Sequence, residues 1–229
     1  MNEYLICLIL FWTFILQSCT TDADDDSDNW DAAKVCPETG NNSYGMPNRG
    51  TFVDERDGQV YKYTTIENQV WMAENLRYDA EYSECEDVFE GFCETFGRYY
   101  SLAKDGAFYG PLDTSVSNHI CPKGWHVPEQ GEWDILFKNM GGDDKLVASR
   151  LKSAEYWGVA RGIGTDLCSF SALPAGGLGQ DEKYDYLFYA AIFVVNSDGL
   201  NTSYGAYGIE SGLTYKNSMH KTSARCLKD

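Results

Sequence analysis

The sequence contains few basic residues and few histidines. Lys and Arg total 18 of 229 residues, against 35 Asp and Glu, which gives a formal net charge of −17 at pH 7. Nucleic-acid binding depends on Lys and Arg that neutralise phosphates, so this balance argues against a nucleic-acid partner. A charge of this size favours a solvated acidic surface and says little about the fold.

The sequence also lacks the short motifs that mark common catalytic and metal sites. It has no H-E-x-x-H, no C-x-x-C, no G-x-S-x-G and no Gly-rich phosphate loop followed by Lys and Ser or Thr. The histidines His119, His126 and His220 are scattered, and His126 beside Trp125 is best interpreted as a packed structural residue. We therefore expect no catalytic residues, no metal ion and no cofactor.

The longest apolar run is too short to span a membrane. Leu5 to Leu16 is an uninterrupted run of twelve apolar or weakly polar residues, whereas a bilayer needs about 20, so the run fits the core of a signal peptide. The next residues, Leu16-Gln17-Ser18-Cys19, resemble the lipobox of bacterial lipoproteins, in which the Cys is acylated after cleavage just before it. The start Met-Asn-Glu-Tyr lacks the usual Lys or Arg, and an ordinary signal peptide is the alternative. We expect residues 1–18 to be the signal peptide and Cys19 to carry a lipid that anchors the protein to the outer membrane.

An acidic segment separates Cys19 from the rest of the chain. Residues 20–28 contain five Asp, and such a run is expected to form an extended, self-repelling tether. It is not an EF-hand loop, because Ser27 and Ala33 stand where that loop needs Gly and Glu. The run resembles the surface-export signal of Bacteroidota lipoproteins, although a plain spacer remains the alternative. Residues 29–50, rich in Asn and Gly, are expected to be a linker or an irregular strap held by Cys36, so that residues 19–50 precede a domain spanning residues 51–229.

Six cysteines remain after Cys7 and Cys19 are set aside. An even number of cysteines in an exported chain favours disulfides. Six cysteines allow fifteen pairings, among which the sequence alone cannot choose. The pairings that we favour are Cys85 with Cys93, Cys121 with Cys226 and, by elimination, Cys36 with Cys168.

Local patterns predict several strands and two or three short helices. Asp57-Gly58 indicates a hairpin turn before a strand at residues 60–66, and Val70-Trp71-Met72 follows a second turn. Apolar residues at helical spacing predict a helix around Trp133 to Met140 that ends at Gly141. A second helix is expected to contain Tyr99, Leu102 and Ala103. A third is expected to start after Asp143-Asp144, whose carboxylates suit a helix N-terminus. Further strands are expected at residues 170–173, 184–195 and 223–227. The class is therefore α+β.

Several blocks, in order, resemble the Fibrobacter succinogenes major paralogous domain. They are D-x-R-D-G-x-x-Y-K from Asp54, I-x-x-Q-x-W-M-A-E-N-L from Ile66, F-G-R-Y-Y from Phe96, C-P-K-G-W-H-V-P from Cys121, F-S-A-L-P-A-G-G from Phe170 and A-R-C from Ala224. The resemblance covers about residues 51–229. It implies a C-type-lectin-like fold, found in secreted or surface proteins that include many lipoproteins, with surface binding or adhesion as the usual supposition. Burial is the expected role of the tryptophans in these blocks and nearby, namely Trp71, Trp125, Trp133 and Trp157.

Two departures limit what the resemblance carries over. The family usually has a Trp-Trp-Ser-Ser strand where this chain has residues 189–195, YAAIFVV, so a family ligand surface is not transferred. Glu129, where the family usually has Ser or Thr before a helix, is expected to be a poorer cap. The Glu-Pro-Asn and Trp-Asn-Asp motifs of calcium-dependent sugar-binding lectins are also missing.

The best ligand-binding hypothesis rests on a tyrosine-rich segment between residues 176 and 207. Aromatic rings with polar neighbours can stack on sugars or anchor a protein partner, and half-buried strand tyrosines are the alternative. The candidates are Tyr184, Tyr186, Tyr189, Tyr204 and Tyr207. We expect a non-catalytic surface protein that binds an extracellular glycan or protein. The alternatives are a structural subunit of a surface complex and an oxidase like the formylglycine-generating enzymes, whose reactive cysteines would be incompatible with disulfides.

Overall fold

The structure is a computed structural model that describes residues 29–85, 88–101, 119–158, 162–179, 181, 183–196, 206–209, 213–216 and 220–229. Cys19, the acidic run and Tyr204 lie outside these residues. Within the described ranges, no helix has the length and apolar character needed to cross a membrane.

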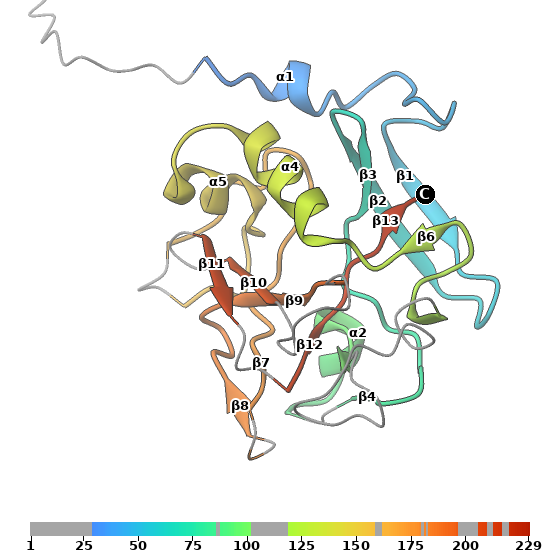
Figure 1. The fold of residues 1–229 in the computed structure, drawn as a ribbon, viewed down its shortest axis with the longest axis vertical. Helices are drawn as coiled ribbons and strands as arrows, with labels where there is room; N and C mark the ends of the chain where they lie inside the picture. The colour runs from blue at the N-terminus through green and yellow to red at the C-terminus, as the bar shows by residue number, and fades with distance from the viewer. Residues whose placement is uncertain are drawn as a thin grey trace, which may run out of the picture.

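The smaller of two sheets is built around the hairpin expected from Asp57-Gly58. Its strands, in spatial order, are β1 (Arg49–Val53), β2 (Val60–Ile66), β3 (Gln69–Met72), β13 (Leu227–Lys228) and β6 (Trp125–His126), all antiparallel (Figure 1). β2 has the bounds predicted from its aromatic and β-branched residues, which suit a half-buried pleated surface. The turn contains Gly58 with φ 79°, in the left-handed region that glycine adopts readily.

The larger sheet collects strands from the second half of the chain and one short hairpin from the first half. Its main path is β11 (Leu213–Lys216), β10 (Ala206–Ile209), β9 (Ala191–Val194), β12 (Lys221–Ser223), β5 (Tyr99–Tyr100) and β4 (Ser83–Glu84), and a side branch adds β7 (Gly177–Leu178) and β8 (Tyr184–Asp185). The described pairings are antiparallel except for the single contact between β9 and β12. With four short helices among the described residues, the α+β class is confirmed.

Two of the helices follow the sequence prediction. α4 (Gln130–Met140) buries Trp133, Leu136 and Met140, and ends at Gly141. α5 (Asp144–Leu151) begins after Asp143, whose carboxylate accepts hydrogen bonds from two backbone N–H groups of the first turn. Glu129, expected to be a poorer cap than Ser or Thr, is the N-cap residue of α4, and the helix start is completed by Glu132, whose carboxylate accepts a hydrogen bond from the backbone N–H of Glu129 at 2.8 Å.

Other boundaries differ from the sequence prediction. Tyr99 lies on strand β5, not in a helix, because the chain there pairs with β12 and β4. Leu102 and Ala103 lie outside the described residues. Residues 170–173 form a loop with one isolated bridge, and the runs 184–195 and 223–227 are each broken into two strands. The helix α2 (Phe92–Phe96) was not predicted, because its five residues are too few to show helical spacing.

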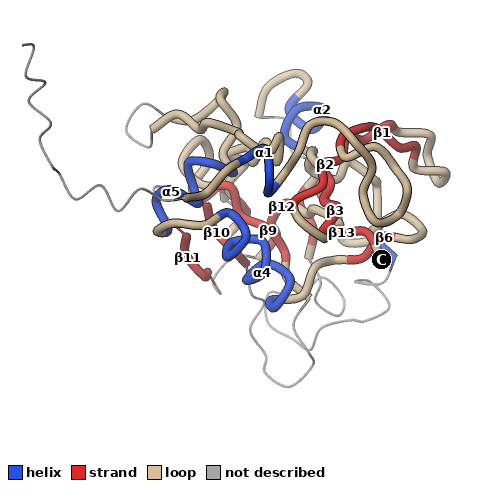
Figure 2. The backbone as a smooth tube through the Cα atoms, turned by 90° about the horizontal axis from the view of Figure 1, so that it is seen from above, coloured by secondary structure: helices blue, strands red, loops and turns tan. Residues whose placement is uncertain are grey.

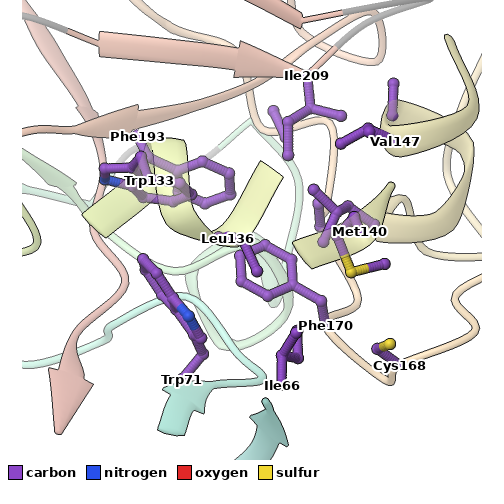
Figure 3. Packing of buried hydrophobic residues seen from close by; sticks show 14 of the residues in the cluster. Ile66, Trp71, Trp133, Leu136, Met140, Val147, Cys168, Phe170, Phe193 and Ile209 are labelled. Atoms are coloured by element: carbon purple, nitrogen blue, oxygen red, sulfur yellow. The ribbon is translucent and has the colours of Figure 1, made fainter. Parts of the chain in front are cut away.

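The main core lies between the sheets and beneath α4 and α5. Trp71 of β3 and Trp133 of α4 are fully buried, with ring centroids 4.7 Å apart, and Trp133 stacks on Phe193 of β9 at 5.3 Å. Figure 3 shows these rings with Leu136 and Met140 reaching into the same space. Each of the four tryptophans expected in the core is 9% exposed or less.

Three disulfides fasten the domain, and they are the three favoured pairings: Cys36–Cys168, Cys85–Cys93 and Cys121–Cys226. The segment before β1 is a strap, not a free linker. Its helix α1 (Ala32–Val35) lies between α5 and strands β2 and β3 (Figures 1 and 2). Trp30 donates a hydrogen bond from Nε1 to Asn139 O at 2.8 Å, and the Arg150 guanidinium lies 4.0 Å from its ring centroid.

The last ten residues join the two sheets. The chain leaves β12 of the larger sheet, passes through Ala224-Arg225-Cys226 and enters β13 of the smaller sheet (Figure 1). Arg225 is fully buried at this crossing and donates to Asn75 Oδ1 at 2.9 Å, to Ser171 O at 2.7 Å and to Phe170 O. Blocks from two distant parts of the sequence therefore converge on the guanidinium of a third.

The glycine of the F-G-R-Y-Y block has a structural role at the same place. Gly97 has φ 79°, and a Cβ there would lie 2.6 Å from Cβ of Asn75. The close approach lets the Asn75 amide donate to Phe96 O at 2.8 Å. A side chain at Gly97 would separate these two segments.

Candidate functional site

A group of aromatic rings reaches the surface around α2. We call Phe89, Tyr156, Tyr184 and Phe188 the aromatic face. Tyr156 and Phe89 are 48% and 42% exposed, and the other two are half-buried. All four rings pack on Phe92 or Phe96 of α2, with centroids 4.9 to 6.4 Å apart across the cluster. Segments far apart in sequence thus present one aromatic surface.

The backbone of this face adopts an unusual conformation for bulky residues. Tyr156, Tyr186 and Phe188 have φ values of 70°, 62° and 63°. Residues other than glycine are uncommon in this left-handed region, and such conformations concentrate at functional sites. The turn at residues 186–189 also exposes Tyr186 and Tyr189, at 44% and 47%.

Two backbone contacts hold the turn against its neighbours. Gly158 N–H donates to Phe188 O at 3.0 Å, which links the Tyr156 segment to the turn. Gly176 N–H donates to Ala190 O at 2.8 Å, and a Cβ on Gly176 would lie 2.3 Å from Asp185 O. Gly176 is therefore more than a simple turn residue, because its missing side chain allows the two segments to approach.

The charge next to the aromatic face is negative. Exposed carboxylates adjoin three of its aromatic residues in sequence, namely Glu90, Glu155 and Asp185, and Glu94 is exposed on α2 itself. The ammonium of Lys183 lies 2.9 Å from Asp181 Oδ2, so this nearby cation is paired with a carboxylate. An anionic ligand would be repelled here.

The structure brings together three of the five tyrosines proposed from the sequence. Tyr184 lies on the aromatic face, and Tyr186 and Tyr189 lie on the adjoining turn. Tyr207 lies on β10, opposite Phe193 of β9, and its side chain is outside the described part of the structure. Sequence reasoning missed Phe89, Tyr156 and Phe188, because no local pattern indicates that these segments meet at α2.

A polar site, separate from the aromatic face, surrounds His126 on β6. Its Nε2 lies 3.0 Å from both Glu132 carboxylate oxygens, and its Nδ1 lies 2.7 Å from Asp229 Oδ1. The hydrogen bond with Glu132, opposed by burial and aided by Asp229, raises the pKa of His126 to about 9. A histidine that stays charged at neutral pH is a poor general base. The arrangement instead ties the first turn of α4 to β6 and the end of the chain.

This ion pair predicts a pH-dependent stability. The folded-state pKa of about 9 exceeds the ordinary value of 6.5, so the stabilisation is fully present below pH 6.5 and is lost as the pH rises through 9. Because the His126 side chain is 35% exposed, we expect a loss of about 1 kcal/mol in the free energy of unfolding over this range. Urea denaturation at pH 6.5 and 9.5 measures it. His126→Gln should remove this part of the pH dependence and His220→Gln should not; a slope unchanged in His126→Gln contradicts the assignment.

Among the described residues, no three His, Cys, Asp or Glu side chains gather closely enough to hold a metal ion. The described polar clusters are explained by helix capping, by ion pairs and by the buried Arg225 network. The aromatic face is therefore the arrangement that most needs a functional explanation.

Comparison with known proteins identifies the family. The model of the Fibrobacter succinogenes major domain matches residues 64–228, which is most of the chain and includes every block from β3 to β13 together with α2 and the aromatic face. No curated protein and no solved structure matches the chain. The chain belongs to the Fibrobacter succinogenes major domain family.

Proposed function

We propose that this protein is a non-catalytic binding module of the cell surface, which holds an extracellular glycan or protein on its aromatic face. The observation that carries the proposal is the set of exposed rings fixed on α2 by left-handed backbone at Tyr156 and Phe188. Rings held in one conformation lose little entropy on binding, and tyrosine supplies both an apolar surface and a hydrogen-bonding group.

The proposal includes a lipid anchor at Cys19 in the outer membrane, with the domain facing outward. The described chain begins beside α1, at the opposite end of the molecule from β8 (Figure 1). A tether that enters at α1 would therefore leave β8, which carries Tyr184 of the aromatic face, at the end away from the membrane. We also propose a C-type-lectin-like fold, which the α+β class, short helices and three disulfides support.

The disulfides argue against the oxidase alternative. That chemistry needs reactive cysteine thiols, and Cys36, Cys85, Cys93, Cys121, Cys168 and Cys226 are all paired. Quantifying thiols in the purified protein under denaturing, non-reducing conditions tests this point. A reactive pair among these six cysteines would favour the enzyme.

The anchor makes a direct prediction. Cells expressing the protein with radiolabelled palmitate should incorporate label, and Cys19→Ala should abolish incorporation and release the protein from membranes. Cys7→Ala is the matched control, because Cys7 lies within the apolar run of the expected signal peptide. Labelling that persists in Cys19→Ala, or recovery of the wild-type protein from the cytosol with reduced cysteines, contradicts the proposal.

The binding role is tested by screening the purified full-length protein against a glycan array and against surface extracts, with and without a chelator. We expect a ligand whose retention falls when Tyr156 is replaced and does not depend on calcium. Binding that no change in the aromatic face affects would contradict the proposal. Crosslinking in intact cells that captures only fixed neighbours, in unchanged amounts after replacement of Tyr156, would favour a structural subunit instead.

A further inference from the structure

We infer that the ligand of the aromatic face is an uncharged polysaccharide, whose sugar rings stack on Tyr156 and Phe89 and whose hydroxyls donate to the neighbouring carboxylates. This inference rests on the proposed function, because it assigns a ligand class to the same face. Three features of the described residues support it: the exposure of the rings, the rigidity of their support and the sign of the charge around them.

The exposed rings suit a sugar because both surfaces are amphipathic. A pyranose presents apolar C–H groups on one side and hydroxyls at its edge, and an aromatic ring with polar neighbours matches that pattern. Tyr156 packs edge-on against Phe96, with centroids 5.1 Å apart and planes at 67°, while almost half of its surface stays exposed. Phe89 meets Phe92 at 83° in the same way. Each exposed ring is thus supported from beneath without being covered.

Rigidity matters more for a sugar than for most ligands. Sugar hydroxyls exchange hydrogen bonds to water for hydrogen bonds to protein, so each contact contributes little net energy. The binding surface must then lose little conformational freedom. The left-handed backbone at Tyr156 and Phe188, the hydrogen bond from Gly158 to Phe188 and the disulfide that joins Cys93 of α2 to Cys85 restrain this surface from several sides.

The charge selects an uncharged chain over an acidic one. Glu90 follows Phe89, Glu94 lies on α2, Glu155 precedes Tyr156 and Asp185 follows Tyr184, and all four are exposed. Uronate, sulfate or phosphate groups would be repelled by these carboxylates. Neutral sugar hydroxyls can donate to them, and hydrogen bonds to a charged acceptor are stronger than neutral ones. A basic protein would also match the charge, and the experiment below separates it from a glycan.

Affinity electrophoresis of the full-length protein in gels containing xylan, mannan or a soluble neutral β-glucan tests the inference, with polygalacturonate as the acidic counterpart. We expect retardation by at least one neutral polymer and none by polygalacturonate. Tyr156→Asn should weaken retardation about 10-fold, which corresponds to about 1.4 kcal/mol. Asparagine tolerates the left-handed backbone, so the loss would report the ring and not misfolding. Phe89→Ser provides a second variant that removes an exposed ring, at a residue whose backbone is not left-handed.

The matched control is Tyr44→Asn. Tyr44 is 43% exposed, similar to Tyr156, but it lies on the strap, where its ring neighbours Lys228. This change should leave retardation unaltered. A loss equal to that of Tyr156→Asn would overturn the assignment to the aromatic face.

The remaining outcomes separate the inference from the proposed function. Binding to polygalacturonate alone, or to a basic protein alone, that is weakened by Tyr156→Asn would overturn the neutral-glycan inference and leave the binding role standing. Binding to neutral polymers that is insensitive to both Tyr156→Asn and Phe89→Ser would overturn the inference. An absence of any ligand affected by either variant would overturn both.

Discussion

Arg225→Met should lower the free energy of unfolding by about 4 kcal/mol, because it leaves three hydrogen-bond acceptors at a buried position without their donor. Arg225 is fully buried, and its guanidinium donates to backbone carbonyls of Phe170 and Ser171 and to the Asn75 side chain. Methionine preserves much of the apolar stem but leaves these acceptors without their donor, and each unsatisfied buried acceptor costs about 1–3 kcal/mol. In a domain of this size, the melting temperature should fall by roughly 10 °C.

Two further variants identify the cause of that loss. Arg225→Lys keeps the charge but replaces the planar fork with a single ammonium, so it should recover only part of the stability. Lys34→Met removes a cation whose side chain is 81% exposed, and it should change stability by no more than about 0.5 kcal/mol. Full stability in Arg225→Lys would mean that charge alone matters and would contradict the network account. Urea denaturation measures all three.

Two of the three disulfides do not hold the strap, namely Cys121–Cys226 and Cys85–Cys93. Removing Cys121–Cys226 should destabilise the domain more than removing Cys85–Cys93. The Cys121–Cys226 bond spans 105 residues, whereas Cys85–Cys93 spans 8. The loop-entropy model assigns about 4.7 kcal/mol to the former and about 2.5 kcal/mol to the latter. Cys121→Ser with Cys226→Ser should therefore unfold at much lower urea concentration than Cys85→Ser with Cys93→Ser.

The structure adds a second reason for that order. Cys226 follows Arg225 at the crossing between the sheets, and its N–H faces Met72 while its carbonyl accepts from Met72 N–H at 3.0 Å. Loss of the bond therefore loosens the segment that connects both sheets, whereas Cys85 lies at the exposed edge of the larger sheet. Equal losses for the two double variants would show that strain or residual denatured structure, not loop length, controls the effect.

Some features were determined by local sequence. The hairpin at Asp57-Gly58, strand β2 and the cap of α5 depend on residues within a few positions of one another. A β-branched run, a glycine with positive φ or a carboxylate at a helix start acts through neighbouring backbone. Such features are therefore readable without tertiary information.

The sequence allows fifteen disulfide pairings, and the favoured one rested on the short spacing of Cys85 and Cys93 and, for Cys36 and Cys168, on elimination. The pairs themselves are tertiary contacts. Cys36, which follows α1 on the strap, meets Cys168 only because the strap lies against the domain. Figure 2 shows α1 in this position over the domain. The strap was one of two interpretations of residues 29–50. The ring of Trp30 contacts the Arg150 guanidinium, and no local pattern in the sequence distinguishes Trp30 from a linker residue.

Tertiary structure alone decided the two features that matter most for function and stability. The aromatic face joins rings from residues 89, 156, 184 and 188 through their common contact with α2, a helix too short to predict. The Arg225 network joins residues 75, 170, 171 and 225. Sequence establishes which residues can form a strand, cap a helix or carry a charge. Which distant residues meet depends on how the sheets and α2 pack, because burying apolar surface and satisfying buried polar groups are properties of the whole domain.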